Sequence, residues 1–265
     1  AVKSLADLNS RLHGDLVFTA VVDEEYKSAG TKKLVEDYRA DAAVVGEPTA
    51  MNVATAHKGF VWIEIETRGK AAHGSVPDKG VDAITHAAKI VSALEGLQTK
   101  LEGRRHTLLG SPKMHTSTIM GGTDWSIIPE RCVLRLERRT LPGESTTSVM
   151  TEIEDMLDGI GRRTNDFHAT AHSTYDMPPL ETAPEEPIVQ LLREALVATI
   201  GGSDHVIGVP YWTDGALLSK LGSIPTCIFG PGDIGVAHSA DEYISIEDVV
   251  GSAKVYRELA QRYCD

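Results

Sequence analysis

Four side chains in this sequence are of the types that bind a metal ion and move a proton beside it: Glu24, Glu25, Glu47 and His238. Carboxylate and imidazole groups suit zinc, cobalt or manganese. Two adjacent glutamates allow one to bind the metal while the other transfers protons. The spacing matches no local metal motif such as HExxH, so the alternative is a set of solvated loop carboxylates.

The elements around these residues favour the metal site. LVFTAVV (16–22) is a continuous apolar run typical of a strand buried in a parallel sheet, and Glu24 and Glu25 follow it directly. A helix is expected over 31–38, and DAAVVGEPT (41–49) predicts a second buried strand that ends at Glu47. His238 follows a glycine-rich turn after another buried strand. Because such sheets bind ligands beyond the carboxyl ends of their strands, we expect these side chains to converge.

The remaining pattern predicts two domains. An amphipathic helix is expected at Val2, Leu5, Leu8 and Leu12. From Lys58 the residues alternate between apolar and polar, and the segment 58–176 predicts the order βαββαβ. Its expected strands and helices are 60–69, 80–97, 113–119, 130–139, 145–160 and 167–174. After residue 177 the α/β pattern returns, with a helix at Pro187–Ile200, strands in IGVP and PTCIFG, and helices at 214–221 and from Ile246.

The expected fold is therefore α/β: a mostly parallel, zinc-aminopeptidase-like sheet domain (1–57 and 177–265) interrupted by an inserted α+β domain (58–176). The 265 residues carry a net charge of −12, which disfavours nucleic acid as a partner, and no apolar run is long enough to suggest a membrane span. Three widely spaced cysteines fit a reducing compartment, so a cytoplasmic protein is expected.

Several ordered segments together resemble one enzyme family. They are VVDEEYKSAGTKKL, DAAVVGEPT, AAHGSVPDKGVDAI, GGTDWSIIPERC with LERRTLPGE, VPYWTDGALL and FGPGDIGVAHSADEY. In this order they resemble the two-metal amidohydrolases, a family that includes acetylornithine deacetylase, succinyl-diaminopimelate desuccinylase, aminoacylase and carboxypeptidase G. The resemblance spans nearly the whole chain.

The resemblance implies two divalent metal ions, with zinc expected and cobalt or manganese as alternatives. It implies that Glu24 is the general base toward a metal-bridging water, that Glu25 and His238 hold one metal, and that Glu47 holds the other. His73 would stabilise the oxyanion in the partner subunit's site, so the inserted domain would form a homodimer and a lid. Apart from this resemblance, the sequence is equally compatible with a functional His73 and with a surface or capping histidine.

The resemblance also assigns residues to the substrate. Arg139 would bind its carboxylate; the alternative is an ion pair with an acid of this chain. Arg138, its neighbour on the strand, is expected at the surface. Ser126 stands where the family has asparagine, and Thr213 lies in the VPYWTDG segment. Both are candidate substrate contacts.

The family's N-terminal HxD motif and its metal-bridging aspartate have no match here. We therefore expect that the chain lacks the front of its catalytic domain and, alone, binds at most one metal weakly and is inactive.

The expected function is metal-dependent hydrolysis of an amide bond in a small N-acyl amino acid. The alternatives are a dipeptidase or carboxypeptidase acting on a short peptide, and a non-catalytic protein that binds or dimerises. A free base beside metal ligands favours the enzyme, since a binding scaffold has no chemical need of one.

Overall fold

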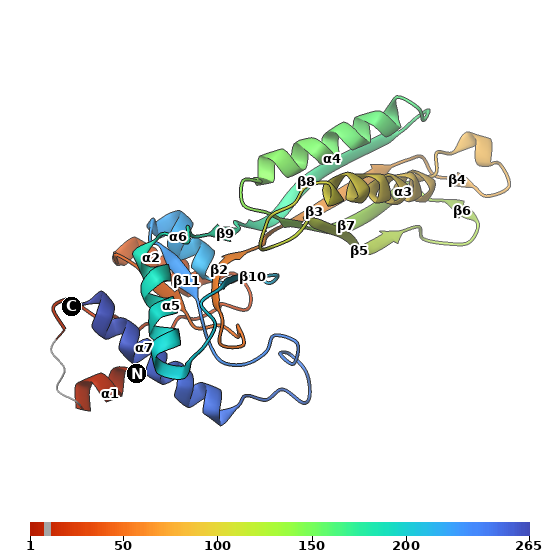
Figure 1. The fold of residues 1–265 in the computed structure, drawn as a ribbon. Helices are drawn as coiled ribbons and strands as arrows, with labels where there is room; N and C mark the ends of the chain where they lie inside the picture. Colours follow the sequence, from red (N-terminus) through yellow and green to blue (C-terminus); the bar gives the residue numbers. More distant parts are fainter. Residues whose placement is uncertain (8–11) are drawn as a thin grey trace. The chain divides into compact units, whose positions relative to one another are not determined.

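The computed structural model describes residues 1–7 and 12–265, and its chain divides into two units (Figure 1). We call residues 1–57 and 179–265 the outer unit, and residues 58–178 the inserted unit. The boundary expected at 176 falls at 178 in the structure. No helix in the described residues has the length and apolar character needed to cross a membrane.

The outer unit is built on a mixed five-stranded sheet in the order β1-β11-β2-β10, with β9 also paired to β2. β1 runs parallel to β11 and β10 parallel to β2, while β11 and β9 are antiparallel to β2. The strand β2 was not anticipated from the sequence. The strands are β1 (Ala43–Val45), β2 (Val53–His57), β9 (Leu180–Glu181), β10 (Val206–Val209) and β11 (Thr226–Ile228).

Helices cover both faces of this sheet. Successive residues of β2 point to opposite sides, so they pack against different helices. Val53 packs in a core cluster with α5 (Pro187–Ile200) and α7 (Ile246–Tyr263), whereas Ala54 packs in a second cluster with α6 (Gly215–Gly222). α2 (Ala29–Asp37) packs against α6. This is the α/β architecture that the sequence predicts.

The N-terminal part of the chain differs from expectation. α1 spans Val2–Asp7, and the rest of the predicted amphipathic helix includes residues outside the described ones. The run 16–22 is not a strand, and Val17, Phe18 and Val22 are 59%, 77% and 70% exposed. A strand buried in a parallel sheet needs a covering helix layer, and this exposure shows that no such layer covers these three side chains. The prediction of a buried strand at 16–22 is therefore wrong for this structure.

The inserted unit has the predicted βαββαβ order, with an antiparallel sheet arranged β5-β7-β3-β8. The two long helices lie on one face of the sheet (Figure 1), where Ile63 and Leu134 pack against Ile90 and Ile153. Asp82 caps one helix, and Ser145 and Ser148 form a capping box on the other. The elements are β3 (Gly59–Arg68), α3 (Ala83–Glu102), β5 (Lys113–Gly121), β7 (Arg131–Thr140), α4 (Thr146–Gly161) and β8 (His168–Met177).

A small two-stranded ribbon completes the inserted unit. β4 (Ala72–His73) pairs antiparallel with β6 (Ile127–Ile128), and a short 3-10 helix (Pro77–Lys79) follows β4. The ribbon was not predicted, but it brings two predicted site segments together, as described below.

Candidate active site

A tight turn between Val22 and Gly30 carries Glu24 and Glu25. The carbonyl of Asp23 accepts hydrogen bonds from the amides of Tyr26, Lys27 and Ser28, and the Gly30 amide donates to the Val22 carbonyl. A Cβ at Gly30 would lie 2.6 Å from the Val22 nitrogen, so this close approach requires glycine. Asp23 and Ser28 have left-handed backbones, with φ of 68° and 53°. The turn is therefore specified by local chain geometry despite the absence of a preceding strand.

His238 meets this turn from the C-terminal part of the outer unit. Its Nε2 lies 3.2 Å from Oε1 of Glu25, and both side chains are exposed. Its backbone is left-handed (φ 59°), and its amide donates to the carboxylate of Glu242. Residues 25 and 238 are far apart in the chain, so the predicted convergence of these two side chains is present in the structure.

Glu47 follows β1 and is held where the chain runs close to the segment after β11. The Phe229 amide donates to the Val45 carbonyl, and a Cβ at Gly230 would lie 2.5 Å from the carbonyl oxygen of Glu47. The Tyr211 hydroxyl donates to the Pro48 carbonyl at 2.7 Å. These contacts fix the backbone on which the half-buried Glu47 side chain is carried.

The carboxylates of the outer unit act on one another electrostatically. Burial, followed by the charges of Asp214 and Glu25, raises the pKa of Glu24 to about 7 against an opposing contribution from His238. The pKa of Glu47 is also raised to about 7, by burial and then by the charges of Glu24, Glu25 and Asp214. A carboxyl group with a pKa near 7 is suited to accept and return a proton at neutral pH.

Asp214 is the member of this cluster that the sequence reasoning missed. It is 4% exposed, its Oδ2 accepts a hydrogen bond from the Thr31 hydroxyl at 2.6 Å, and its Oδ1 has no hydrogen-bond partner. A signal was available, because Asp214 directly follows the predicted Thr213 in the segment VPYWTDG. A buried carboxylate oxygen without a partner is costly and requires an explanation.

The chemistry of this cluster fits a divalent cation. Carboxylates and an imidazole are zinc ligands, and a cation would relieve both their repulsion and the unpartnered Asp214 oxygen. The assembly is partial, however. Among the described residues, no group of three or more His, Cys, Asp or Glu side chains is arranged to hold a metal ion. The structure brings Glu25 and His238 into contact and leaves Glu47 outside that pair.

Two further predicted residues meet in the inserted unit. The β4–β6 ribbon pairs His73 with Ile127, and the Gly74 amide donates to the Ser126 carbonyl at 2.7 Å. Nδ1 of His73 accepts a hydrogen bond from the Ser75 amide at 3.1 Å. A neutral ring in this arrangement carries its proton on Nε2. His73 and Ser126 are both exposed.

Arg139 and Arg138 occupy opposite faces of β7. Nε of Arg139 donates to Oε1 of Glu137 at 2.7 Å, and its guanidinium lies 5.5 Å from the Phe60 ring centroid. The ion-pair alternative for Arg139 is thus present, while part of its side chain stays exposed. Arg138 is 1% exposed and bonds Glu144 at 2.7 Å, so the expectation that it lies at the surface is wrong. Arg138 faces the helices and meets the carboxylate that precedes α4.

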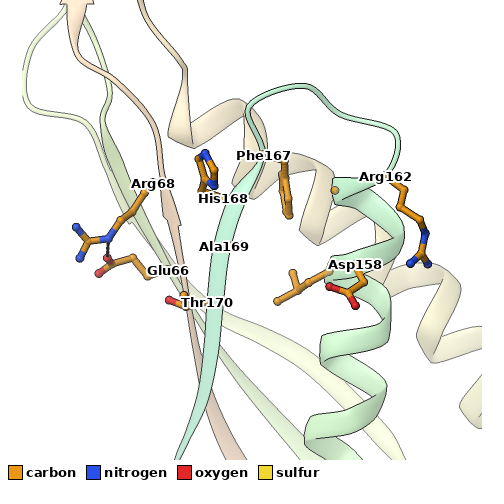
Figure 2. Close-up of a pocket in the computed structure, with 10 residues that line it drawn as sticks. Glu66, Arg68, Asp158, Arg162, Phe167, His168, Ala169 and Thr170 are labelled. Atoms are coloured by element: carbon orange, nitrogen blue, oxygen red, sulfur yellow. Dashed lines mark ion pairs between the residues drawn. The ribbon is translucent and has the colours of Figure 1, made fainter.

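Thr213 is completely buried, and its hydroxyl accepts a hydrogen bond from the Gly215 amide at the start of α6. Its contact with substrate stays a prediction. A hollow of about 580 Å³ lies elsewhere, in the inserted unit, between β3, β8 and α4 (Figure 2). Figure 2 shows Glu66 paired with Arg68 on its wall, and none of the predicted site residues lines it.

Comparison with known proteins identifies the family. The model of peptidase family M20/M25/M40 matches residues 1–262. The chain belongs to peptidase family M20/M25/M40. This is a family of hydrolases, and the resemblance drawn from the sequence motifs is confirmed.

Two relatives of this M20/M25/M40 chain are acetylornithine deacetylases. That of Myxococcus xanthus is 31% identical over 98% of this chain and 68% of its own length. That of Buchnera aphidicola is 28% identical over 92% of this chain and 64% of its own length. The chain thus spans about two thirds of the length of these curated relatives.

Solved structures support the fold of this M20/M25/M40 member. An aminopeptidase PepT from Bacillus cereus superposes with a TM-score of 0.83 at 21% identity, covering 100% of this chain and 68% of its own. A Bacillus subtilis protein described as a dinuclear metal binding peptidase of family M20 superposes with a TM-score of 0.76 at 19% identity. The match covers 99% of this chain and 69% of the Bacillus subtilis chain. At these identities the likeness shows the shared fold.

Proposed function

We propose that the protein hydrolyses the amide bond of small N-acyl amino acids, as a deacetylase or desuccinylase. The observation that carries the proposal is the placement of Glu24 in a partly buried site beside Asp214 and Glu25, where burial first and then these two charges raise its pKa to about 7. Stability alone gives no reason to gather these acids, whereas hydrolysis needs a poised base beside cation ligands. The names of the deacetylase relatives support this choice of substrate class.

Glu24 is the general base in this proposal. It would take a proton from the attacking water and return it to the leaving amine, because its raised pKa lets it do both near neutral pH. Glu24 also lies next to Glu25, whose carboxylate is already in contact with His238. The two adjacent glutamates thus divide the work of base and ligand.

Glu25, Glu47 and His238 would hold divalent cations, zinc in the first place and cobalt or manganese as alternatives. The ligand pair Glu25–His238 and the carboxylate of Glu47 would belong to two different cations. Such cations supply Lewis acidity toward the scissile carbonyl and toward the attacking water. Binding of both cations would require further ligands, because no group of three or more His, Cys, Asp or Glu side chains is arranged to hold a metal ion in the part of the chain that the structure describes.

The inserted unit would complete the reaction as a lid and a homodimer interface. His73 would donate a hydrogen bond from its Nε2–H to the oxyanion of the partner subunit's site, since its Nδ1 is already an acceptor. Arg139 would bind the substrate carboxylate, with Ser126 and Thr213 as further contacts. Glu137 contacts Arg139 through Nε, and the substrate carboxylate would bind the two terminal nitrogens of the guanidinium.

The experiment uses the natural protein at its encoded length, loaded with zinc, and follows hydrolysis of N-acetyl-L-ornithine, N-succinyl amino acids and dipeptides. We expect deacylation, and we expect Glu24→Gln to lower kcat by roughly 10²–10⁴ with little change in KM or zinc content. Glu36→Gln is the control, because Glu36 is an exposed acid paired with Lys33. Full activity of Glu24→Gln, or cleavage of dipeptides alone, would overturn the proposal.

We also propose a cytoplasmic location. Its support is that Cys132, Cys227 and Cys264 are all free thiols, with the first two buried. Fractionation of cells followed by immunodetection tests this, and recovery outside the cytoplasm would contradict it.

A further inference from the structure

Two buried side chains link the turn that carries Glu24 and Glu25 to a helix distant in sequence. Thr31 lies in the first turn of α2, directly after Gly30, and Asp214 immediately precedes α6. The Thr31 hydroxyl donates to Oδ2 of Asp214 at 2.6 Å, and the residues are only 2% and 4% exposed. A hydrogen bond to a buried carboxylate is among the stronger neutral-to-ionic contacts in proteins.

The turn needs such a link, because its own hydrogen bonds close it on itself. The acceptors at Val22, Asp23 and Glu24 all lie within the turn, and the donors are Tyr26, Lys27, Ser28, Ala29 and Gly30. These bonds set the shape of the turn and do not attach it to the sheet. Besides the exposed contact of Glu25 with His238, the turn is joined to the rest of the outer unit by the packing of α2 against α6, where Thr31 meets Asp214.

The choice of an aspartate at this position is costly. Asp214 is buried, has one oxygen without a partner, and lies within electrostatic range of Glu24 and Glu47. An asparagine could accept the same hydrogen bond without adding a charge. A costly charged group beside the proposed site, where a neutral side chain could accept the same hydrogen bond, points to a role in that site rather than in stability.

We propose that Asp214 is a positioning residue that fixes the Glu24–Glu25 turn against α6 through the hydroxyl of Thr31. The inference rests on the proposed function only in treating Glu24 and Glu25 as the residues that need fixing. The structural link itself is independent of which reaction the protein performs.

Hydrogen exchange measured by mass spectrometry on peptides covering residues 22–30 tests the link in the 265-residue chain. Thr31→Val keeps the side-chain volume and removes the donor, so exchange of the turn amides should accelerate about tenfold or more. Thr31→Ser keeps the hydroxyl and should restore slow exchange. Thr182→Val is the matched control, since Thr182 is also buried and makes a 2.6 Å hydrogen bond, to the Thr226 carbonyl.

Unchanged exchange in Thr31→Val, or equal acceleration in Thr182→Val, would overturn the proposal. A second readout uses the natural protein: Thr31→Val should lower kcat more than it changes KM, and Thr31→Ser should recover kcat. A wild-type protein without hydrolytic activity would remove the proposed function and leave the exchange result to decide this inference.

Discussion

Glutamates in the two units have opposite electrostatic surroundings. In the inserted unit, Glu66 is paired with Arg131 at 2.6 Å and with Arg68 at 2.7 Å, and the Arg131 hydrogen bond lowers its pKa. In the outer unit, burial and neighbouring carboxylates raise the pKa of Glu24 and Glu47 to about 7. Glutamates are thus paired with arginines in the inserted unit and lie near other carboxylates in the outer unit.

The difference separates glutamates with arginine partners in the inserted unit from the glutamates of the outer unit to which the proposed function assigns chemistry. Arginine partners remove the cost of a carboxylate in the inserted unit, as Arg138 and Arg104 do for Glu144. In the outer unit, burial and the neighbouring carboxylates all raise the pKa of Glu47. At Glu24 the charge of His238 lowers the pKa and so opposes the other contributions. A site that must bind cations has to keep such carboxylates without permanent partners.

The largest expected effect on stability concerns the buried pair in the inserted unit. Arg138→Met should lower the free energy of unfolding of this unit by about 3–5 kcal/mol, because it leaves the mostly buried Glu144 with a weakened network. Chemical denaturation followed by hydrogen exchange of the inserted unit measures it. Arg135→Met, which breaks the exposed Arg135–Glu64 pair, is the control and should cost under about 1 kcal/mol. Equal effects of the two variants would remove the distinction between the networks.

The second prediction concerns a neutral donor that the inserted unit supplies. His73→Ala should lower kcat of the natural protein by roughly 10²–10³, as expected for loss of an oxyanion donor. Nitrogen NMR of the His73 ring should show the proton on Nε2, because Nδ1 accepts from Ser75. His115→Ala is the control, since it alters a histidine on β5. A proton on Nδ1, or full turnover by the His73 variant, would contradict the proposed role.

The third prediction concerns the affinity of the outer unit for cations. The contact between Glu25 and His238 and the absence of a larger ligand group among described residues predict at most one weak zinc site in the 265-residue chain. His238→Ala should weaken zinc binding by about 10–100-fold in isothermal titration, and His205→Ala, a change at another exposed histidine, should not. Two tight sites in the wild-type chain would show that other residues complete the ligand set.

The sequence predicts the inserted unit better than the outer unit because its signals are local. Alternation in β3 and the caps of α3 and α4 follow from neighbouring residues, and the predicted order βαββαβ along the chain is correct. The run 16–22 has the composition of a buried strand, yet its exposure depends on what lies beside it. The sequence pattern within the run does not determine which elements pack against it.

The candidate site shows the same limit. Glu25 and His238 were expected to converge on the edge of a sheet, and they do meet. Arg138 was placed wrongly because strand alternation tells which residues share a face, and not which face the helices cover. Asp214 was missed because its importance comes from burial and from Thr31, which lies far away in sequence.

The smallest predicted effect tests whether the charge of Glu47 destabilises the folded chain, as its raised pKa implies. A carboxyl group whose pKa is raised from 4.5 to about 7 on folding binds its proton more tightly in the folded state, so the folded state loses stability as pH rises from about 4.5 through 7. Removing the charge should therefore help the metal-free chain. Glu47→Gln should be more stable than wild type at pH 8, by on the order of 1 kcal/mol after screening of this partly exposed group, or about 2–4 °C in Tm.

At pH 4.5 this advantage should disappear, because Glu47 is then protonated in the folded chain and about half protonated in the unfolded chain. Glu66→Gln is the matched control from the inserted unit, and it should give no gain at pH 8, since that carboxylate has arginine partners. Thermal unfolding of the three proteins at the two pH values, with chelator present, makes the measurement. A Glu47 variant less stable than wild type at pH 8 would mean that its carboxylate is paired, and a gain that persists at pH 4.5 would mean that charge is not the cause.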